Sequence, residues 1–375
     1  MRIMIVKLSS IGDVVHTLPA AAALRRSFPE ANIVWAVGPR ASDIPRHCPA
    51  IDRVIELTNG RKGESWAGGL RRQLGQVRSE RADVVIDFQG LLKSGLVAFA
   101  SGASRRIGFA APDLREQGSA FFLTDRVATH HIGHVIDKNL ALSAAAVDLV
   151  GNGGIQRNGA GEKQIADEHM IEDHAGGAGA GTASGYNFPL VVPDEDERYA
   201  QSLAAECGGR FAIVNPGGGW PTKLWQASRY GQIADWLQAE HKLCSLITYG
   251  PGEELLADQV AEGSRSGAAR PVPSTLLQFV ALARRATLFV GGDTGPLHLA
   301  AACRTPIVGL YGPTSPGRNG PFDPSDVSVG RDLWCRPDCH RRSCWHWECM
   351  EISVGDVQQA ISKRLLAAAA CHGRS

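Results

Sequence analysis

The sequence has little of several features that would assign a protein to a class at once. No run approaches the roughly 18 consecutive apolar residues of a membrane-spanning helix, and the opening segment MRIMIV is too short for the core of a secretion signal. These absences predict a cytoplasmic protein. The 9 cysteines include no C-x2-C pair of the kind usual in zinc sites, and the scattered ones are expected to be reduced thiols. The scattered cysteines are Cys48, Cys207, Cys244, Cys303 and Cys371.

Two common phosphate-binding motifs are missing as well. The sequence contains no G-x-x-x-x-G-K-[ST], which argues against a P-loop nucleotide hydrolase. The first apolar run is followed by SSIGD instead of G-x-G-x-x-G, which argues against dinucleotide binding in the first part of the chain. Aromatic residues amount to 6% and are not interleaved with basic ones, and the pI is about 7.7, so the composition argues against a nucleic-acid binder.

Length and charge describe an ordinary soluble protein with an uneven charge distribution. The length of 375 residues exceeds what one hydrophobic core usually supports and predicts two domains. The formal net charge is only +1, but residues 1–150 carry 19 Lys and Arg against 14 Asp and Glu, and the rest carries 20 against 24. Two explanations stay open: an anionic partner of the first half, or chance variation among surface charges.

Short apolar runs alternate with Ala- and Leu-rich segments of helical length. RIMIVKL, NIVWAV and ADVVIDF predict strands, and VVHTLPAAAALRRSF and GLLKSGLVAFASG predict helices. The alternation returns after residues 150–186, whose Gly- and Ala-rich composition cannot pack a core. The predicted fold class is α/β, with two Rossmann-like parallel-sheet domains facing across a cleft. The expected divisions are domains at 1–150 and 188–350, a linker or insertion at 151–187, and a last helix at 351–375.

The segment FVGGDTGPLHLAAA carries the most information about a ligand. A buried strand ends in a glycine pair, Asp293 and Thr294 follow, and Gly295 begins a helix with proline in its first turn. Proline loses no hydrogen bond there, and the amides at the start of the helix direct partial positive charge at whatever lies in front of them. This predicts a diphosphate site; the alternative is an ordinary strand-to-helix turn capped by Asp293 or Thr294.

Two more glycine-rich strand ends, NPGGGWPTKLW and TYGPGEE, are expected on the same side of the second sheet. Gly217, Gly218 and Gly219 let backbone amides approach a ligand closely. Lys223 is placed to reach a phosphate oxygen, and Glu254 stands where dinucleotide-binding folds hold a ribose hydroxyl. The alternatives are a surface lysine and a carboxylate that favours the helix start. Three converging loops favour a nucleotide diphosphate as the ligand.

Two further segments contain candidate metal ligands. The run PDEDER places Asp194 and Asp196 in a D-x-D pattern, but a proline followed by carboxylates is more typical of a helix start. The run CRPDCHRRSCWHWEC spaces four cysteines as C-x3-C-x4-C-x4-C, for which a bound metal, reduced thiols and a disulfide stay open. These four are Cys335, Cys339, Cys344 and Cys349.

The segment LSSIGDVVHTLP places one acidic residue, Asp13, directly behind a glycine near the end of the first strand. If a nucleotide sugar binds to the second domain, this loop faces the sugar, and Asp13 is placed to act as a general base on an acceptor hydroxyl. The alternative is that Asp13 caps the helix that begins at Val14. The residues support both interpretations equally.

These segments resemble the ADP-heptose:lipopolysaccharide heptosyltransferases of glycosyltransferase family 9, and the beginning of the chain is most similar to the heptosyltransferase I branch. The resemblance rests on KLSSIGDVVHTLP, VVIDFQGLLKSGL, RIGF, NPGGGWPTKLW, YGPGEE, GGDTGPLHLAAA and VGLYGPTSP. It implies a metal-independent GT-B fold, inversion at the anomeric carbon, and a last helix that returns to the N-terminal domain.

The resemblance also implies roles for individual residues. Asp13 takes the proton from a hydroxyl of 3-deoxy-manno-octulosonic acid (Kdo), and Lys223 neutralises the departing diphosphate. The implied donor-binding residues are Gly218 and Gly219, Glu254 for the adenosine ribose, Asp293 for heptose hydroxyls, Thr294 and Gly295 for phosphate, and His298. ADP-heptose is the implied donor substrate, and no cofactor is required.

The implied acceptor is an anionic lipid A–Kdo core at the cytoplasmic face of the inner membrane, which fits the basic first half and implies a peripheral enzyme. The segment NGRKGES holds fewer arginines than family members carry near this position, which leaves the acceptor open. The alternatives are a different sugar donor or acceptor, such as a protein or another glycan, and a non-catalytic nucleotide-sugar binding protein. The candidate acceptor contacts are Arg61, Lys62, Lys93, Arg105, Arg106, Arg115 and Arg126.

Overall fold

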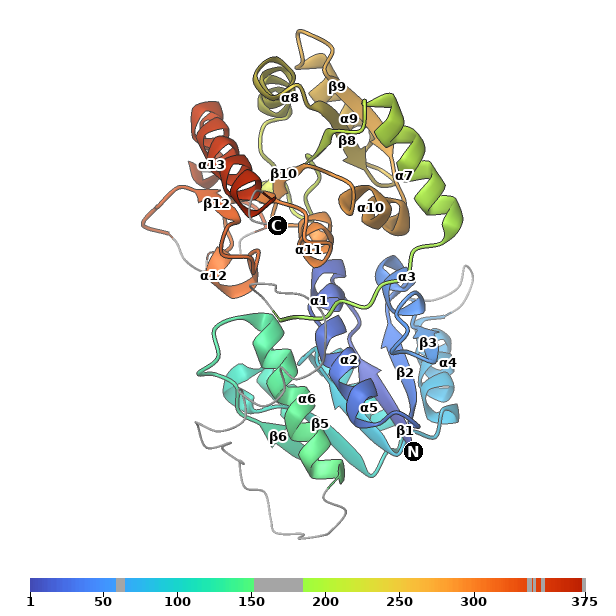
Figure 1. Ribbon diagram of the computed structural model, residues 1–375. Helices are drawn as coiled ribbons and strands as arrows, with labels where there is room; N and C mark the ends of the chain where they lie inside the picture. Colours follow the sequence, from blue (N-terminus) through green and yellow to red (C-terminus); the bar gives the residue numbers. More distant parts are fainter. Residues whose placement is uncertain (59–64, 152–184, 336–338, 340–341, 345–347, 373–375) are drawn as a thin grey trace. The chain divides into compact units, whose positions relative to one another are not determined.

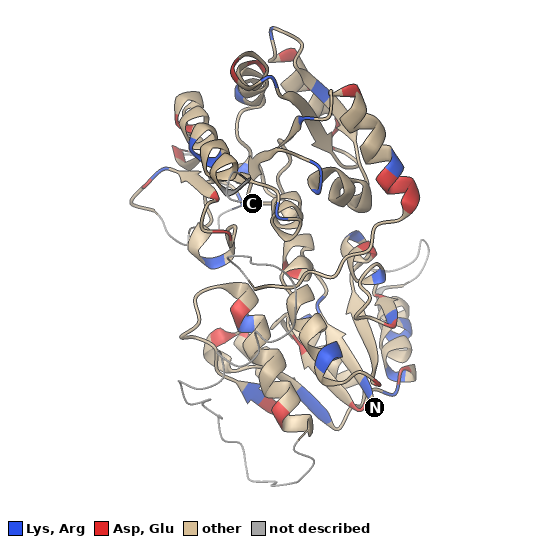
Figure 2. Cartoon of the chain, viewed as in Figure 1, with Lys and Arg blue, Asp and Glu red and all other residues tan. Residues whose placement is uncertain are grey.

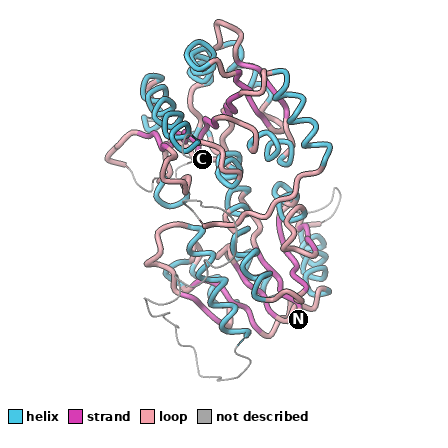
Figure 3. Tube along the Cα trace, viewed as in Figure 1, coloured by secondary structure: helices cyan, strands magenta, loops and turns pink. Residues whose placement is uncertain are grey.

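The chain forms two compact units, Met1–Val191 and Val192–Ser375 (Figure 1). The computed structural model describes residues 1–58, 65–151, 185–335, 339, 342–344 and 348–372. Each unit is built around its own six-stranded parallel sheet, and helices alternate with strands in both (Figure 3). The predicted α/β class with two parallel sheets is confirmed. The glycine-rich segment 152–184 lies outside the described residues, so its role as a linker or insertion stays a prediction.

The first unit has the strand order β3-β2-β1-β4-β5-β6. Its strands are β1 (Arg2–Val6), β2 (Asn32–Val37), β3 (Arg53–Glu56), β4 (Val84–Asp87), β5 (Arg105–Phe109) and β6 (Asp125–Val127). Its helices are α1 (Ile11–Val15), α2 (Leu18–Ser27), α3 (Asp43–Arg46), α4 (Trp66–Ser79), α5 (Leu92–Ala100), α6 (Val135–Gly151), and the 3₁₀ helices η1 (Pro39–Ala41), η2 (Ala111–Asp113) and η3 (Gln117–Phe122). In the centre of the sheet, Ile3 of β1 lies opposite Ile33 on one side and Val84 on the other. Burial on both faces explains the continuous apolar runs of β1 and β2.

The single helix expected over residues 14–28 is two helices, α1 and α2. Pro19 lies in the first turn of α2. In one continuous helix its ring would clash with the carbonyl of Val15, four residues earlier. The chain turns at His16 and Thr17 instead, and the side chain of Asn139 from α6 donates to the carbonyl of His16 at 3.0 Å. Figure 1 shows α2 and α6 side by side, and Ser143 of α6 donates to the carbonyl of Ala20 at 3.0 Å.

The second unit repeats the topology of the first, with the strand order β12-β11-β10-β7-β8-β9. Its strands are β7 (Phe211–Asn215), β8 (Cys244–Tyr249), β9 (Ala269–Pro273), β10 (Leu288–Gly292), β11 (Ile307–Tyr311) and β12 (Val327–Gly330). Its helices are α7 (Asp194–Glu206), α8 (Ala227–His241), α9 (Glu254–Glu262), α10 (Leu276–Ala283), α11 (Gly295–Ala302), α12 (Pro316–Asn319), α13 (Val354–His372), and the 3₁₀ helices η4 (Pro221–Lys223) and η5 (Glu348–Met350).

Each sheet has one position where the strand order reverses. It lies between β1 and β4 in the first unit and between β7 and β10 in the second. At such a switch point the connections leave in opposite directions and open a crevice beyond the carboxyl ends of the strands, where ligands of open α/β sheets bind. Two candidate ligand positions, one in each unit, follow from topology alone.

The acidic run PDEDER is a helix start, as its composition favours. Helix α7 begins at Asp194 after Pro193, and four acidic residues lie in its first turn. Figure 2 shows this acidic end of α7 in red. Carboxylates are stabilised there by the partial positive charge of the helix N-terminus.

The last helix packs into the core of the second unit. In the structure, α13 belongs to the second unit, and Val357, Ala360 and Ile361 are buried in the core that also contains residues of β10 and β11. Arg364 of α13 donates to the carboxylate of Asp326, just before β12, at 2.7 Å. Apolar burial and this buried ion pair therefore attach α13 to the second sheet, while its return to the N-terminal domain stays a prediction. None of the helices in the described part of the chain has both the length and the apolar character to cross a bilayer.

The expectation that all five scattered cysteines are reduced is wrong for two of them. Cys207 follows α7, Cys244 begins β8, and the two form a disulfide. The physical reason is strand pairing: Phe211 of β7 lies opposite Cys244, which brings the segment just before β7 to the start of β8. Cys48 and Cys303 are free thiols, and burial raises their pKa to about 11 and about 12. The side chain of Cys371 lies outside those described.

Candidate active site

The switch point of the second unit carries the predicted Asp293–Thr294 turn. All five residues of β10 are buried, and the strand ends at Gly292. Thr294 has extended backbone angles and precedes α11, which begins at Gly295 and has proline in its first turn. The backbone amides at this turn therefore lie at the start of a helix, as the sequence predicts.

Asp293 is the centre of a buried polar group that joins four elements. Its carboxylate oxygen Oδ2 accepts a hydrogen bond from Lys223 Nζ at 2.6 Å, and Lys223 also donates to the main-chain carbonyl of Asp293 at 2.9 Å. The other oxygen, Oδ1, lies 3.2 Å from Nε2 of His298 on α11 and accepts from Asn319 of α12 at 3.0 Å. Lys223, Asp293 and His298, predicted separately from the sequence, are thus brought together. Asn319 was not predicted.

The surroundings keep the Asp293 carboxylate ionised. Only 3% of its side chain is exposed, and this burial by itself would raise its pKa. The hydrogen bond and charge of His298, followed by the charge and hydrogen bond of Lys223, outweigh burial and hold the pKa well below its usual range. The Lys223 ammonium also lies 4.7 Å from the ring centroid of Trp220, a distance at which a cation is attracted to an aromatic face.

The three glycines after β7 have different neighbours. A Cβ on Gly217 would lie 2.6 Å from Oε1 of Glu253, and one on Gly218 would lie 2.8 Å from the side chain of Leu224. A Cβ on Gly219 would meet nothing within 4 Å. Packing within the protein therefore accounts for the first two glycines, while Gly219 borders open space.

The loop after β8 contains two glutamates with different environments. The exposed Glu254 accepts a hydrogen bond from Gly252 N–H at 3.1 Å. Hydrogen bonds from its own backbone N–H and from Gly252 lower its pKa. Glu253, which no sequence motif marks, lies against Gly217 and accepts from Gly250 N–H at 3.1 Å. It therefore connects the loops after β7 and β8. In the sequence, only the position of Glu253 directly before Glu254 could have indicated a role for it.

The switch point of the first unit carries Asp13 in the third position of α1. Its Oδ2 accepts hydrogen bonds from the backbone N–H of Ser10 at 2.8 Å and from the hydroxyl of Ser10 at 3.0 Å. Asp13 therefore makes the reciprocal contact of a capping box at this helix start. The side chain is half-buried. The helix begins at Ile11 and not at Val14 as expected, so Asp13 supports the helix start from its third position, with Ser10 as the N-cap. This contact leaves a carboxylate at the carboxyl edge of the sheet in a fixed orientation.

A set of contacts from neighbouring strands holds the loop that leads to Asp13. The side-chain carbonyl of Gln89, after β4, accepts from the backbone N–H groups of Leu8 at 2.9 Å and Ser9 at 3.1 Å. From β2, Trp35 donates to the carbonyl of Lys7 at 3.2 Å. A Cβ on Gly38 would lie 2.7 Å from the carbonyl oxygen of Leu8, so glycine permits this close approach. These contacts fix the path of the chain before α1.

Next to this loop, the ends of β1 and β4 are followed by or contain two buried ionisable residues, Lys7 and Asp87. Lys7 donates to the carbonyl of Phe88 at 2.7 Å. Asp87 accepts from the backbone N–H of Gln89 at 2.8 Å and from the hydroxyl of Ser94 at 2.8 Å. Burial raises the pKa of Asp87, and its hydrogen bonds and the charge of Lys7 act in the opposite direction. The backbone of Gln89, whose side chain holds the loop before α1, is therefore itself held by a buried carboxylate.

The basic residues predicted as acceptor contacts do not all lie together. Arg105 and Arg106 are neighbours in β5 and point to opposite faces. Arg105 donates to the carbonyl of Leu149 on α6, and Arg106 donates to the carbonyl of Phe122 on η3. Lys93 on α5 and Arg115 before η3 are exposed. Arg61 and Lys62 lie outside the described residues.

The four cysteines near the end of the chain lie close enough to influence one another. Burial raises the pKa of Cys349, and the negative charges that Cys335, Cys339 and Cys344 carry when ionised raise it further. Among the residues whose positions are described, no group of three or more side chains has the geometry of a metal site.

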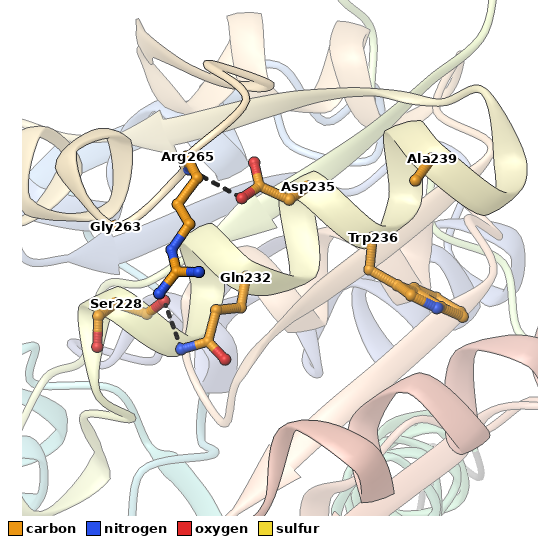
Figure 4. A pocket seen from close by; sticks show the side chains of 7 residues that line it. All are labelled: Ser228, Gln232, Asp235, Trp236, Ala239, Gly263 and Arg265. Atoms are coloured by element: carbon orange, nitrogen blue, oxygen red, sulfur yellow. Dashed lines mark hydrogen bonds between the residues drawn. The ribbon is translucent and has the colours of Figure 1, made fainter.

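A separate hollow in the second unit lies between α8 and the turn that follows α9 (Figure 4). Asp235 faces it, and its carboxylate accepts from the hydroxyls of Ser264 at 2.5 Å and Ser266 at 2.6 Å and from the backbone N–H of Arg265 at 2.8 Å. These bonds lower the pKa of Asp235. The carboxylate thus stabilises the turn, and the hollow contains none of the predicted site residues.

Comparison with solved structures supports the fold. The chain superimposes on "E. coli heptosyltransferase WaaC with ADP" with a TM-score of 0.64 at 22% identity, covering 98% of this chain and 100% of that one. It superimposes on E. coli ADP-heptose lps heptosyltransferase II with a TM-score of 0.69 at 19% identity, covering 98% of this chain and 99% of that one. The fold is the GT-B fold, with two Rossmann-like domains.

Sequence comparison gives the family. The chain is 28% identical to lipopolysaccharide heptosyltransferase 1 of Pseudomonas aeruginosa over 92% of this chain and 87% of that protein. It is 28% identical to lipopolysaccharide heptosyltransferase 1 of Escherichia coli K12 over 86% of this chain and 91% of that protein. The profile of glycosyltransferase family 9 (heptosyltransferase) matches residues 70–346. The chain is therefore a glycosyltransferase that belongs to family 9, the heptosyltransferase family.

Proposed function

We propose that this chain transfers heptose from ADP-heptose to the Kdo residue of an inner-core lipopolysaccharide acceptor, with inversion at the anomeric carbon. The observation that supports this most is where the predicted residues lie. Asp13 and the Lys223–Asp293 pair each occupy the switch point of their own sheet, beyond the carboxyl ends of the strands. The relatives named lipopolysaccharide heptosyltransferase 1 and the related structure that contains ADP support the donor and the acceptor class.

The proposed reaction is a single displacement. An acceptor hydroxyl oxygen attacks the anomeric carbon of heptose from the face opposite ADP. The new carbon–oxygen bond forms as the bond from that carbon to the β-phosphate oxygen breaks, and the electron pair of the broken bond leaves with ADP. The hydroxyl proton goes to the Asp13 carboxylate. Attack on one face and departure from the other invert the configuration.

The second unit supplies the groups that favour departure of ADP. The Lys223 ammonium and the amides of Thr294 and Gly295 stabilise the charge that develops on the diphosphate. Asp293 holds Lys223 in place through two contacts, at 2.6 and 2.9 Å, in addition to its proposed contact with heptose hydroxyls. His298 acts through Asp293, and Gly219, which borders open space, leaves room for the donor.

The ribose contact belongs to the loop after β8. Glu254 is the proposed acceptor for a ribose hydroxyl, since it is exposed at the start of α9. Glu253 connects this loop to the loop after β7 through Gly250 and Gly217 and sets the spacing between them. Glu254 therefore acts as the ligand contact and Glu253 as a positioning residue.

The proposed acceptor is anionic and carried by the cytoplasmic face of the inner membrane. Lys93, Arg106 and Arg115 lie on α5, on β5 and before η3, and are proposed contacts for its phosphates. Arg105 faces α6 instead and is not grouped with them. Arg61 and Lys62 remain proposed contacts from outside the described part of the chain.

A donor panel with the purified chain tests the proposal. ADP-heptose, with UDP- and GDP-sugars for comparison, is supplied with a Kdo-bearing lipid A acceptor, and both released nucleotide and glycosylated acceptor are measured. We expect transfer from ADP-heptose only. Transfer from another donor, or to a protein, points to a different family 9 reaction, and nucleotide-sugar binding without transfer points to a binding protein.

The base is tested by Asp13→Asn, which keeps an oxygen that accepts from Ser10. Loss of a general base lowers the transfer rate by about 100-fold or more, while the affinity for ADP is expected to stay the same. Asp194→Asn is the matched control, because Asp194 is an exposed aspartate in the first turn of α7 with no proposed role. Near-normal turnover by Asp13→Asn removes this carboxylate from the reaction.

A further inference from the structure

Three large apolar side chains project into solvent from one small region of the first unit. Their exposed fractions are 50% for Leu92, 56% for Phe99 and 88% for Phe121. Leu92 and Phe99 are seven residues apart in α5, two turns of the helix, and therefore share one face. Phe121 lies in η3. Exposed apolar side chains occur singly on most surfaces, whereas these three project from two elements that pack against each other.

These side chains project from an ordered base. The rings of Phe99 and Phe122 are 6.0 Å apart. A Cβ on Gly95 of α5 would lie 2.7 Å from the Phe122 ring, and one on Gly118 of η3 would lie 3.1 Å from Leu92. Because α5 and η3 pack this closely through Phe122, the two elements that carry the exposed side chains keep fixed positions relative to each other.

Two arginines hold η3 against the sheet and bring positive charge to the same region. Arg106 donates to the carbonyl of Phe122 at 2.7 Å, and its guanidinium lies 5.7 Å from the ring centroid of Phe99. Arg126 donates to the carbonyl of Ala120 at 3.0 Å. Within the part of the chain that the structure describes, neither guanidinium is in a salt bridge. Both donate to uncharged carbonyl oxygens, which do not neutralise their positive charge.

Lys93 and Arg115 add exposed basic side chains next to Leu92 and just before η3. Glu116 accepts from the backbone N–H of Leu92 at 2.7 Å and is the acidic residue closest in sequence to η3 on this side. We call the three apolar and four basic residues the α5/η3 surface. They are Leu92, Phe99, Phe121, Lys93, Arg106, Arg115 and Arg126.

We propose that the α5/η3 surface docks on the anionic surface of a lipid bilayer. Apolar side chains that project among basic ones enter the boundary between headgroups and acyl chains, while the basic groups bind lipid phosphates. The positive charge favours an anionic surface over a neutral one. The two projecting phenylalanines can enter a lipid layer, because lipids move aside around an inserted side chain. This inference deepens the proposed function, because a bilayer is where the proposed lipid-linked acceptor resides.

Vesicle sedimentation tests the surface without requiring catalysis. The full-length chain is mixed with vesicles of phosphatidylcholine containing phosphatidylglycerol, and with vesicles of phosphatidylcholine alone. We expect binding to the anionic vesicles that weakens as salt is raised. The double variant Phe99→Ser/Phe121→Ser is expected to bind at least about tenfold more weakly, because apolar insertion is lost. Lys93→Gln/Arg115→Gln is expected to reduce binding only to anionic vesicles.

The matched control is Leu255→Ser/Leu366→Ser, which removes two side chains of 71% and 73% exposure from the second unit. This control is expected to bind vesicles like the unaltered chain, and circular dichroism establishes that each variant is folded. Equal binding by the phenylalanine variant, or equal binding to both vesicle types, overturns the proposal. Self-association that is abolished by the phenylalanine variant, without vesicle binding, identifies a protein interface instead.

The same variants separate this inference from the proposed function. On a soluble, deacylated Kdo acceptor the phenylalanine variant is expected to have the turnover of the unaltered chain. Failure of the proposed function appears as absence of transfer by the unaltered chain, whatever its vesicle binding. Failure of the docking proposal appears as vesicle binding unchanged by the variants, whatever the turnover.

Discussion

Asp293 connects more of the candidate site than any other residue described. Its carboxylate binds Lys223 from η4, His298 from α11 and Asn319 from α12. A buried carboxylate without such partners would be costly, and three partners convert it into a fixed acceptor. The residue therefore sets where the Lys223 ammonium lies before any ligand is present.

Asp293→Asn should change both the stability and its pH dependence. The pKa of Asp293 in the folded chain lies below that of an unfolded aspartate, so the ionised carboxylate stabilises the fold above about pH 4, and this stabilisation is lost as the pH falls toward the folded pKa. Removal of one partner of a buried ion pair costs about 3–5 kcal/mol. We expect this loss at pH 7, and a smaller acid dependence below pH 4 in the variant.

Urea unfolding of the second unit at pH 7, 4 and 3 measures both effects. Asp194→Asn serves as the control, since that carboxylate is exposed. Identical pH dependence in the Asp293→Asn variant and the unaltered chain would contradict the assigned ion pair.

At the scale of elements, close contact between helices depends on glycine in one place and not in another. Gly231 lies in α8, and a Cβ there would be 2.6 Å from both the carbonyl oxygen of Val260 and the backbone nitrogen of Ser264 at the end of α9. Gly75 lies in α4, and a Cβ there would meet nothing within 4 Å. The same substitution therefore has opposite consequences in the two helices.

Gly75→Ala is expected to raise the free energy of unfolding by about 0.5–1 kcal/mol, because alanine loses less backbone entropy in a helix. Gly231→Ala gains the same term but forces two backbones apart, and we expect a net loss of about 1–3 kcal/mol. Urea unfolding of both variants decides the sign. Stabilisation by Gly231→Ala would mean that α8 and α9 do not pack as closely as described.

At the scale of the whole molecule, each unit has its own sheet and its own buried core. Because each unit has its own core, we expect two unfolding transitions, one for each unit. The proposed donor site belongs to the second unit. A ligand that binds only the folded second unit stabilises that unit by mass action.

Calorimetry of the full chain with ADP tests this division. At 100 times its dissociation constant, ADP is expected to stabilise the second unit by about 2.7 kcal/mol, which raises its transition by about 5–10 °C. The other transition should stay in place, and Lys223→Met should greatly reduce the shift. A single transition that ADP shifts as a whole would show that the two units unfold together.

The sequence predicted much of the fold because its signals are local. Apolar runs of five or six residues gave the strands, and glycine and proline marked their ends, as at Gly292 and Gly295. Distant contacts left no local signal. Gln89 reaches Leu8 across 81 positions, and the partner of Cys207 depends on the pairing of β7 with β8. Arg105 and Arg106 are adjacent in the sequence, but in β5 their side chains point to opposite faces of the sheet.

The order of residues along the chain already specified the residue types of the candidate site, the alternation of strands and helices, and the family. These depend on the order of neighbouring residues, which fixes hydrophobic period and turn chemistry. The folded chain adds that Asn319 and His298 share the carboxylate of Asp293, that Glu253 joins two loops, and that α13 packs on the second sheet. Such pairings follow from strand order and packing, which bring together segments that no local pattern connects.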